Sequence, residues 1–451
     1  MNPGFTTSRR GILKAAVLPV AAPYVSRLSW VQGSPMQRLQ YAAIGADGRG
    51  GADIGSMISH AQIHIVAAAD VDAAAQAKVK NRFSELETFF DWREMLRSRN
   101  DEIDIVSVST PDHMHGIQAM SAMNLGKHVY VQKPLAQSIG ECRAMQETAK
   151  RNDVLVQMGT QGASSLYDRM ATALIQQEPV GKISEVWTVS GKSWGDTKPF
   201  SDAVDPVPEG LDWDGWLGVG EERPYVDNYY HPKNWRRRQE YGCGTLGDMG
   251  CHIFNAMYRG LELTAPTAVR SATAVPNRYN WTSNERVEYR FPGTRYTESE
   301  LRMTWVSGRE SPPAELMSMI PKGTNFRFGC LLVGSEGVLM TRHGSSPMVL
   351  PREKFAGVRP EKLESMGGHH HSFIDAVIAG RGDGELLSPI DFAAPLTEFI
   401  LLGNIAMQHS PDWLEWDSKK AKIINNKEAS ERVHRSYREG WAVMGAGGHE
   451  G

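Results

Sequence analysis

The sequence predicts an α/β domain with a doubly wound parallel sheet, followed by an α+β domain with a mostly antiparallel, open sheet. Up to about residue 158, short apolar runs rich in Val and Ile alternate with helix-length segments, as in a parallel sheet covered by helices on both faces. After residue 160 the strand-like segments follow one another between glycines, which favours antiparallel pairing. The length of 451 residues suits two or three domains.

The expected elements follow this alternation along the chain. We divide the chain into a leader (1–35), a nucleotide-binding domain (36–158) and an α+β domain (159–451) whose last helices pack back on the nucleotide-binding domain. In the nucleotide-binding domain we expect strands at 41–44, 63–69, 103–108, 128–131 and 154–158, and helices at 73–83, 92–97, 115–125 and 138–151. In the α+β domain we expect helices at 166–177, 371–379 and 394–408, and strands at 267–274, 286–291, 301–305, 326–333 and 337–341.

The N-terminus is typical of a twin-arginine export leader. Arg9 and Arg10 precede a short apolar run that ends near Pro23, and this run is below the ~18 to 20 residues that span a bilayer. The alternative is a pair of ordinary surface arginines. We find no later window apolar enough to cross a membrane, so we expect a periplasmic protein without stable membrane insertion.

Composition excludes some classes of partner and scaffold. The chain has 49 Lys and Arg against 52 Asp and Glu, with a net charge of -3. Because the basic residues form no stripe, we expect no nucleic-acid binding. Four cysteines are too few for a disulfide scaffold.

A glycine-rich turn follows the first expected strand. Gly45, Gly48 and Gly50, with Arg49 among them, provide the small residues where helix N–H groups meet a pyrophosphate. Asp47 stands where the G-x-G-x-x-G fingerprint has its second glycine. We expect its carboxylate to point away from the phosphates, because like charges repel.

Asp70 ends the second expected strand, where an acidic side chain accepts hydrogen bonds from ribose hydroxyls. The same charge repels a 2′-phosphate, so the sequence favours NAD over NADP. Asp72 could share or replace that role, and Asp70 could instead be an ordinary turn residue.

Two further turns follow expected strands, at the sheet edge where open α/β sheets bind ligands. They supply these candidate cofactor contacts: Ser109, Thr110, Pro111, His113, His115, Gln132 and Lys133.

Asp248 and His252 are candidate catalytic residues together with Lys133. Their i, i+4 spacing places them on one face of a helix. Near a helix N-terminus the dipole favours neutral imidazole, which can accept the hydroxyl proton during oxidation of a secondary alcohol. Lys133 could polarise that hydroxyl. The alternatives are a structural hydrogen bond and half of a divalent metal site; we expect no metal.

The loop before this helix carries polar and aromatic side chains suited to a sugar. His231, Trp235 and Arg236 are candidate substrate contacts alongside the three catalytic candidates, and His369 could also reach the pocket.

The turn from Thr110 to His115, the Gln132-Lys133-Pro134 segment and the glycine-rich run leading to His252 resemble the glucose–fructose oxidoreductase / inositol dehydrogenase / MocA family. The resemblance covers essentially all of the mature chain. In that family the middle segment typically reads Glu-Lys-Pro, so Gln132 removes a charge that could tune the lysine. The resemblance implies a Rossmann-type domain, an NAD(P)-dependent oxidoreductase, and dimers or tetramers formed through the open sheet.

We therefore expect an exported enzyme that moves hydride between a sugar or polyol secondary hydroxyl and NAD. Because free NAD should be scarce outside the cytoplasm, we expect the cofactor to stay tightly bound and to be recycled. Two alternatives remain open. One is a redox-neutral glycosidase or lyase that oxidises a glycoside transiently and eliminates its leaving group. The other is a non-catalytic sugar-binding protein.

Overall fold

A computed structural model describes residues 38–197, 203–361, 363–364, 366–380, 386–409 and 411–445. The predicted export leader lies outside the described residues. From Arg38 onward the chain forms one unit.

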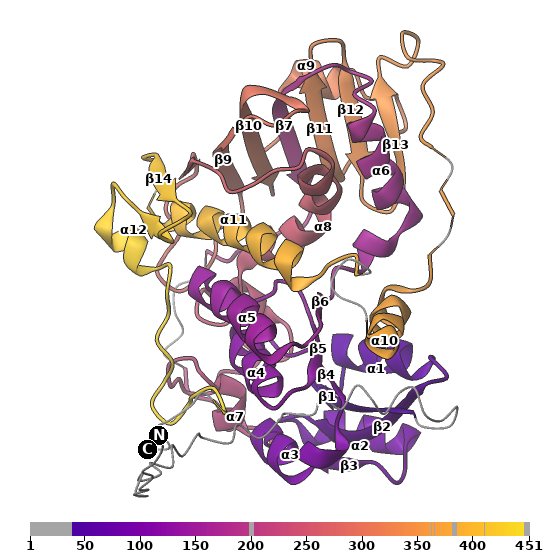
Figure 1. Cartoon of the computed structure of the whole chain (residues 1–451). Coiled ribbons are helices and arrows are strands. Elements are labelled where there is room, and N and C mark those ends of the chain that lie inside the picture. The colour runs from indigo at the N-terminus through magenta and orange to yellow at the C-terminus, as the bar shows by residue number, and fades with distance from the viewer. Residues whose placement is uncertain are drawn as a thin grey trace, which may run out of the picture. The chain divides into compact units, whose positions relative to one another are not determined.

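The first part of the described chain forms a six-stranded parallel sheet with the order β3-β2-β1-β4-β5-β6 (Figure 1). The strands are β1 (Leu39–Ile44), β2 (Ile63–Ala69), β3 (Glu87–Phe89), β4 (Ile105–Val108), β5 (His128–Val131) and β6 (Val156–Met158). The helices between them are α1 (Arg49–Ile58), α2 (Ala73–Arg82), α3 (Trp92–Ser98), η2 (Asn100–Glu102), α4 (Asp112–Asn124) and α5 (Ile139–Asn152). The strand order reverses between β1 and β4, and doubly wound sheets bind their ligands at such a point.

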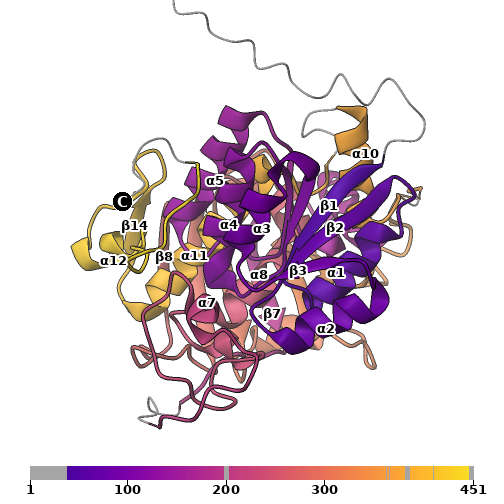
Figure 2. The same ribbon diagram turned by 90° about the horizontal axis from the view of Figure 1, so that it is seen from below.

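Helices cover both faces of this sheet because successive side chains of a strand point to opposite sides. Ala42 and Ile44 of β1 belong to the core under α3, α4 and α5, whereas Tyr41 and Ala43 belong to the core under α1 and α2. Figure 2 shows the two groups of helices on opposite sides of the strands. Strands buried on both faces explain the nearly continuous apolar runs in the sequence.

The second sheet, nine-stranded within the described residues, has the order β13-β12-β11-β7-β10-β9-β8-β14-β15. Its strands are β7 (Ile183–Ser190), β8 (Ala268–Ser271), β9 (Glu285–Pro292), β10 (Thr297–Ser307), β11 (Phe328–Gly334), β12 (Val338–Arg342), β13 (Ser345–Leu350), β14 (Leu414–Asp417) and β15 (Lys422–Ile423). Only the pairing of β7 with β10 is parallel among the described strand pairs of this sheet. Both sheets match the predicted fold class.

Helices α8 (Gly244–Gly260) and α11 (Ile390–Gln408) connect the two sheets. Helix α8 packs on β7, β10 and β11, while α11 packs on α5, α8 and β9. Helix α10 (His369–Ala379) packs on α1. The other elements are η3 (Gln161–Ser164), α6 (Leu166–Gln176), α7 (Trp213–Leu217), η4 (Asn234–Arg237), α9 (Ala314–Ser318) and α12 (Lys427–Glu431).

The expectation that no later window is apolar enough to span a membrane is wrong for α11. Among the described residues this helix is long and apolar enough by length and composition, but 83% of its apolar window is buried. Its apolar character is explained by its place in the core, where a helix surrounded by protein is apolar on every side.

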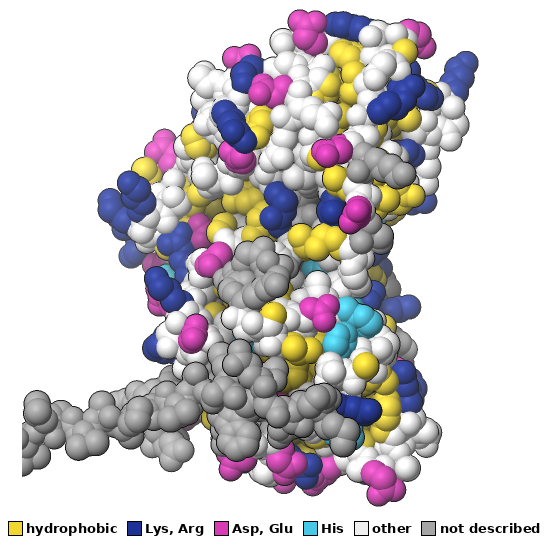
Figure 3. Space-filling model, turned by 45° about the vertical axis from the view of Figure 1, so that its right-hand side comes forward, with side chains coloured by type: hydrophobic (Ala, Val, Ile, Leu, Met, Phe, Trp, Pro, Cys, Tyr) yellow, Lys and Arg dark blue, Asp and Glu magenta, His cyan; other side chains and the backbone are white. Residues whose placement is uncertain are grey.

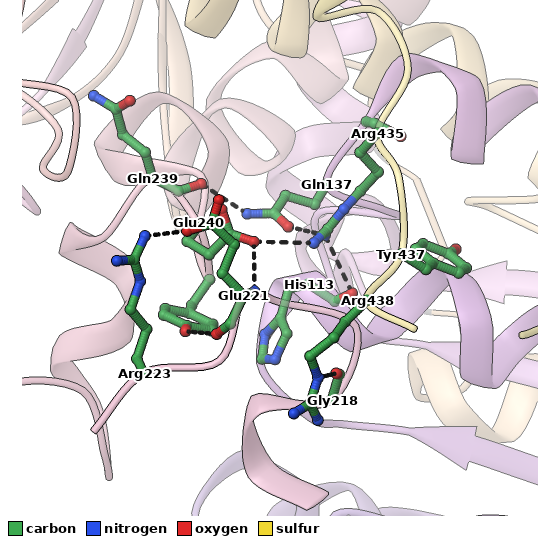
Figure 4. Close-up of polar contacts among 12 residues, drawn as sticks. His113, Gln137, Gly218, Glu221, Arg223, Gln239, Glu240, Arg435, Tyr437 and Arg438 are labelled. Carbon is green, nitrogen blue, oxygen red and sulfur yellow. Dashed lines mark hydrogen bonds and ion pairs between the residues drawn. The ribbon is translucent and has the colours of Figure 1, made fainter. Parts of the chain in front are cut away.

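The segment after α12 returns to the first domain and is held by charged and polar contacts (Figure 4). Arg435 donates to Gln137 of the first domain and lies 3.7 Å from Glu240. The hydroxyl of Tyr437 donates to Glu141 at 2.8 Å, and Arg438 donates to the carbonyl oxygen of Gly218 at 3.0 Å. This segment therefore ties the loop after α7 to the parallel-sheet domain.

The face of the molecule shown in Figure 3 carries Lys and Arg side chains interspersed with Asp and Glu. No single sign of charge dominates it. This mixture fits the near balance of acidic and basic residues in the sequence.

Candidate active site

A cavity of about 680 Å³ lies at the carboxyl edge of the parallel sheet. The turns after β1, β2, β4 and β5 line it from the first domain, and the loop before α8 lines it together with α8 from the second. Of the predicted site residues, the cavity is lined by Gly45, Asp47, Gly48, Arg49, Asp70, Ser109, Thr110, Pro111, Gln132, Lys133, His231, Trp235, Arg236, Asp248 and His252.

At Gly45 and Gly50 the glycine turn packs too closely to accept a side chain. Gly45 has a φ of +92°, and a Cβ there would lie 2.7 Å from the carbonyl oxygen of Ser109. A Cβ at Gly50 would collide with the carbonyl group of Gly45. Helix α1 then begins after Gly48 without a side-chain cap, whereas Asp72 caps α2. The first N–H groups of α1 thus remain available for an anion at the cavity wall.

Asp47 is turned toward α2. Its carboxylate accepts a hydrogen bond from Lys78 at 2.6 Å, and this contact lowers the pKa of Asp47. The side chain is half exposed. Asp47 brings a negative charge to the position where the fingerprint has a glycine, and the ion pair with Lys78 offsets that charge. The carboxylate lies against Lys78 of α2, in line with the expectation that it points away from the phosphates.

Asp70 holds the glycine turn in place through hydrogen bonds to the backbone. One carboxylate oxygen accepts the backbone N–H of Ala46 at 2.8 Å, and the other accepts that of Asp72 at 3.0 Å. Burial raises the pKa of Asp70. Each oxygen keeps a further lone pair for a ribose hydroxyl. Asp72 caps α2 and lies 3.3 Å from His231.

Three predicted cofactor contacts, Gly50, His113 and His115, do not line the cavity. His113 is fully buried against Trp216 and Tyr241, and burial lowers its pKa to about 3. The ring nitrogens of His115 lie 2.7 Å and 2.9 Å from the carbonyl oxygens of Pro134 and Thr110. Both histidines hold the turns that shape the cavity.

Gln132 joins a buried polar network under the glycine turn. Its amide donates to Asp53 of α1 at 2.8 Å, and the hydroxyl of Ser109 donates to the same carboxylate oxygen at 2.9 Å. The other oxygen of Asp53 lies 3.0 Å from Nε2 of His370 in α10. A glutamate at position 132 would face Asp53 with a second negative charge, so an amide fits this environment better.

Lys133 and Asp248 meet across the cavity from separate domains. The Lys133 ammonium donates to Oδ1 of Asp248 at 2.6 Å and to its backbone carbonyl oxygen at 3.1 Å. Oδ2 of Asp248 accepts from the Trp194 indole at 2.7 Å and from Lys192 at 3.1 Å. We call Lys133, Asp248 and His252 the reacting end of the cavity.

The charge of Asp248 is stabilised by its neighbours. Burial alone would raise its pKa, but three nearby cations, Lys133, Lys192 and Arg236, hold it well below its ordinary value. Asp248 is therefore a fixed anion that positions the ammonium of Lys133.

His252 stays neutral for a different reason from the expected one. Helix α8 begins at Gly244, so His252 lies beyond its first two turns and the dipole has little effect there. Burial and the charge of Lys133 lower its pKa instead. Its ring lies 5.3 Å from that of His343, and its buried Nδ1 has no hydrogen-bond partner among the described residues.

The predicted substrate contacts separate into two groups. His231 lies beside Asp72, at the nucleotide side of the cavity. Arg236 stacks on Trp235 at 4.1 Å and has its Nε 3.7 Å from Asp248, at the reacting end. His369 is bonded to Ser164 and to a backbone carbonyl oxygen outside the cavity.

Lys192 and Trp194 line the cavity and donate hydrogen bonds to Asp248, but neither was among the predicted site residues. Both follow β7, for which no strand was predicted. The β-branched and aromatic residues of Ile183–Ser190 are the signal that would have indicated it.

These features fit a dinucleotide. The uncapped start of α1 suits a pyrophosphate, Asp70 lines the cavity with carboxylate oxygens that suit ribose hydroxyls, and the unpartnered Nδ1 belongs to a histidine that borders the cavity. Among the described residues, no group of three or more His, Cys, Asp or Glu side chains could hold a metal ion.

Comparison with known proteins assigns the family. Residues 39–160 match the oxidoreductase family with an NAD-binding Rossmann fold, and residues 186–293 match the C-terminal alpha/beta domain of that family. The chain belongs to the Gfo/Idh/MocA oxidoreductase family. Its first domain is an NAD-binding Rossmann domain, as the sequence predicted.

Individual relatives match over shorter stretches. The levoglucosan dehydrogenase of Pseudarthrobacter phenanthrenivorans is 26% identical over 216 residues, which cover 48% of this chain and 46% of that protein. A glycosyl hydrolase family 109 protein of Shewanella sp. (strain ANA-3) is 43% identical over 60 residues, 13% of each chain. The matched segments thus span less than half of these relatives.

Solved structures share the fold. An inositol dehydrogenase homolog from Azotobacter vinelandii, complexed with NAD+, superposes with a TM-score of 0.58 at 17% identity and covers 84% of this chain and 98% of its own. At this identity the likeness concerns the fold alone.

Proposed function

We propose that this protein is an NAD-dependent oxidoreductase that moves hydride between a secondary hydroxyl of a sugar or polyol and a tightly bound nicotinamide cofactor. The observation that carries the proposal is the convergence of Lys133, Asp248 and His252 on the cavity that the glycine turn also lines. The levoglucosan dehydrogenase among its relatives supports a sugar-like substrate.

Each residue has a defined task in this proposal. A bound nicotinamide supplies the hydride acceptor. His252, neutral because of burial, accepts the hydroxyl proton of the substrate. Lys133 donates a hydrogen bond to the same oxygen and stabilises the negative charge that develops there. Asp248 holds the Lys133 ammonium in place. Asp70 receives the ribose hydroxyls and disfavours a 2′-phosphate, so we propose NAD rather than NADP.

The test starts from purified holoprotein. Denaturation should release nicotinamide nucleotide, and candidate sugars added to the holoprotein should produce the near-ultraviolet band of reduced nicotinamide. His252→Ala and Lys133→Ala should each abolish this signal while nucleotide stays bound. The proposal fails if no nucleotide is released or rebound, and the site assignment fails if both variants turn over normally.

A redox-neutral glycosidase is the second candidate. The glycosyl hydrolase family 109 relative, with 43% identity over its matched segment, supports it. Such an enzyme would oxidise a glycoside transiently, eliminate the glycosidic leaving group and return the hydride after water adds. Cleavage of a chromogenic glycoside without lasting nicotinamide reduction would favour this candidate over the dehydrogenase.

We further propose that the protein is exported by the twin-arginine route to the periplasm, which the Arg9-Arg10 motif supports. A tightly held cofactor suits a compartment where free NAD should be scarce. Replacing both arginines by lysine should retain the protein in the cytoplasm, as measured by fractionation.

We also propose a homodimer or homotetramer formed through the open sheet, which light scattering would test.

A further inference from the structure

The reacting end of the cavity carries an excess of positive charge. The cavity lining at and around it has three cations, Lys133, Lys192 and Arg236, and two carboxylates, Asp112 and Asp248. His252 adds no charge, because burial lowers its pKa well below the ordinary value. Even with both carboxylates ionised, positive charge remains without a counterion from these residues.

Asp248 cannot neutralise this excess alone. Its single negative charge is shared by Lys133 at 2.6 Å, Lys192 at 3.1 Å and Arg236 at 3.7 Å. The second carboxylate, Asp112, accepts the backbone N–H of Cys243 at 3.0 Å, and burial raises its pKa. Because Asp248 is shared among three cations and the pKa of Asp112 is raised, the positive charges of Lys192 and Arg236 are only partly neutralised.

Arg236 is held as a fixed fork. Its guanidinium stacks on the Trp235 ring at 4.1 Å, and its Nε lies 3.7 Å from Oδ1 of Asp248. Its two terminal nitrogens make no hydrogen bond with the described residues, and the side chain is 26% exposed. A planar guanidinium fixed on an aromatic ring with a free fork matches the two oxygens of a carboxylate or phosphate.

We propose that the substrate is an anionic sugar or polyol, whose carboxylate or phosphate group is bound by the fork of Arg236 with support from Lys192. This inference rests on the proposed oxidoreductase function. The anion would lie beside the reacting hydroxyl, which is held by Lys133 and His252. If the cations served only to hold Asp248, the site would show no preference for charged sugars.

Calorimetry on the holoprotein tests this directly. Hexoses would be compared with their matched hexuronates and hexose 6-phosphates. We expect one anionic series to bind about 10- to 100-fold tighter than the neutral sugars, the range of charge-assisted hydrogen bonds. The series that gains identifies the anion as carboxylate or phosphate. Equal binding of charged and neutral sugars would overturn the inference.

Variants localise the effect. Arg236→Met should lose the preference, and Arg236→Lys, which keeps the charge without the fork, should recover only part of it. Arg237→Met is the matched control: Arg237 belongs to the same short helix η4, but it donates to the carbonyl oxygen of Gly195 and does not line the cavity. The preference of the Arg237→Met variant for anionic over neutral sugars should match that of wild type. Preference retained in Arg236→Met, or lost equally in Arg237→Met, contradicts the inference.

The binding and reduction measurements also distinguish failure of the anionic-substrate inference from failure of the proposed oxidoreductase function. Nicotinamide reduction by neutral sugars without preference for anions would leave the oxidoreductase standing and refute the anionic substrate. Absence of both binding and reduction with every sugar would refute both.

Discussion

Replacing Asp248 by Asn removes the counter-charge of three cations while keeping the shape of the side chain. Lys133 is 15% exposed and Asp248 7%, so their pair is largely out of water, whereas Lys192 is 47% exposed. Loss of one partner of a buried ion pair costs about 3 to 5 kcal/mol. An exposed pair contributes no more than about 1 kcal/mol. We therefore expect Asp248→Asn to lower the unfolding free energy by about 3 to 5 kcal/mol, mostly through Lys133.

Guanidinium chloride unfolding, followed by tryptophan fluorescence at one fixed NAD concentration, measures this loss. Lys192→Met is the control and should cost less than about 1 kcal/mol. The double variant Lys133→Met/Asp248→Asn should be more stable than Asp248→Asn alone, because it no longer buries an unpaired ammonium. An Asp248→Asn protein within about 1 kcal/mol of wild type, or a double variant less stable than the single one, would refute this account.

Three further predictions concern catalysis, the glycine turn and pH. His252→Gln should lower kcat roughly 100- to 10,000-fold, as expected for loss of a general base, with NAD affinity unchanged by calorimetry; a smaller loss would assign the base elsewhere. Gly50→Ala should abolish NAD binding because its methyl collides with the Gly45 carbonyl, whereas Gly51→Ala, whose Cβ would lie 3.2 Å from a carbonyl oxygen, should retain it. Burial raises the pKa of Glu285 from 4.5 to about 7. Stability from this group is present below pH 4.5 and is lost as pH rises through 7, by roughly 3 kcal/mol. Glu285→Gln should remove that slope in unfolding free energy measured against pH, and an unchanged slope would contradict the assignment.

The sequence predicted best those elements whose pattern is local. Strand β2 has the expected bounds, because a run of mostly buried apolar residues, interrupted only by the exposed His64, is a strong signal. Strand β3 was not predicted, because its three residues are too few to give a periodic signal. Strand β7 was missed because half-buried polar residues interrupt its apolar ones. Helix α4 begins at Asp112, before the predicted start at residue 115, because Pro111 precedes it as the N-terminal cap.

The site was predictable where the topology alone determines position. Lys133 follows a strand of the parallel sheet, so it had to reach the edge where that sheet binds ligands. His113 and His115 begin α4, which is buried nearly all round, so the spacing could not show which face meets the cavity. Lys192 could not be assigned because its contact with Asp248 joins segments far apart in the chain.

The buried face of β1 also sets the order in which this chain can fold during synthesis. Tyr41 and Ala43 share their core with Phe373 and Val377 of α10, more than 300 positions later. A ribosome has therefore released most of the polypeptide before that layer can close. Until then the nascent first domain exposes this apolar surface, so we expect it to be prone to aggregation. A fragment that stops before α10 should aggregate, and supplying the missing helix as a separate peptide should restore its solubility.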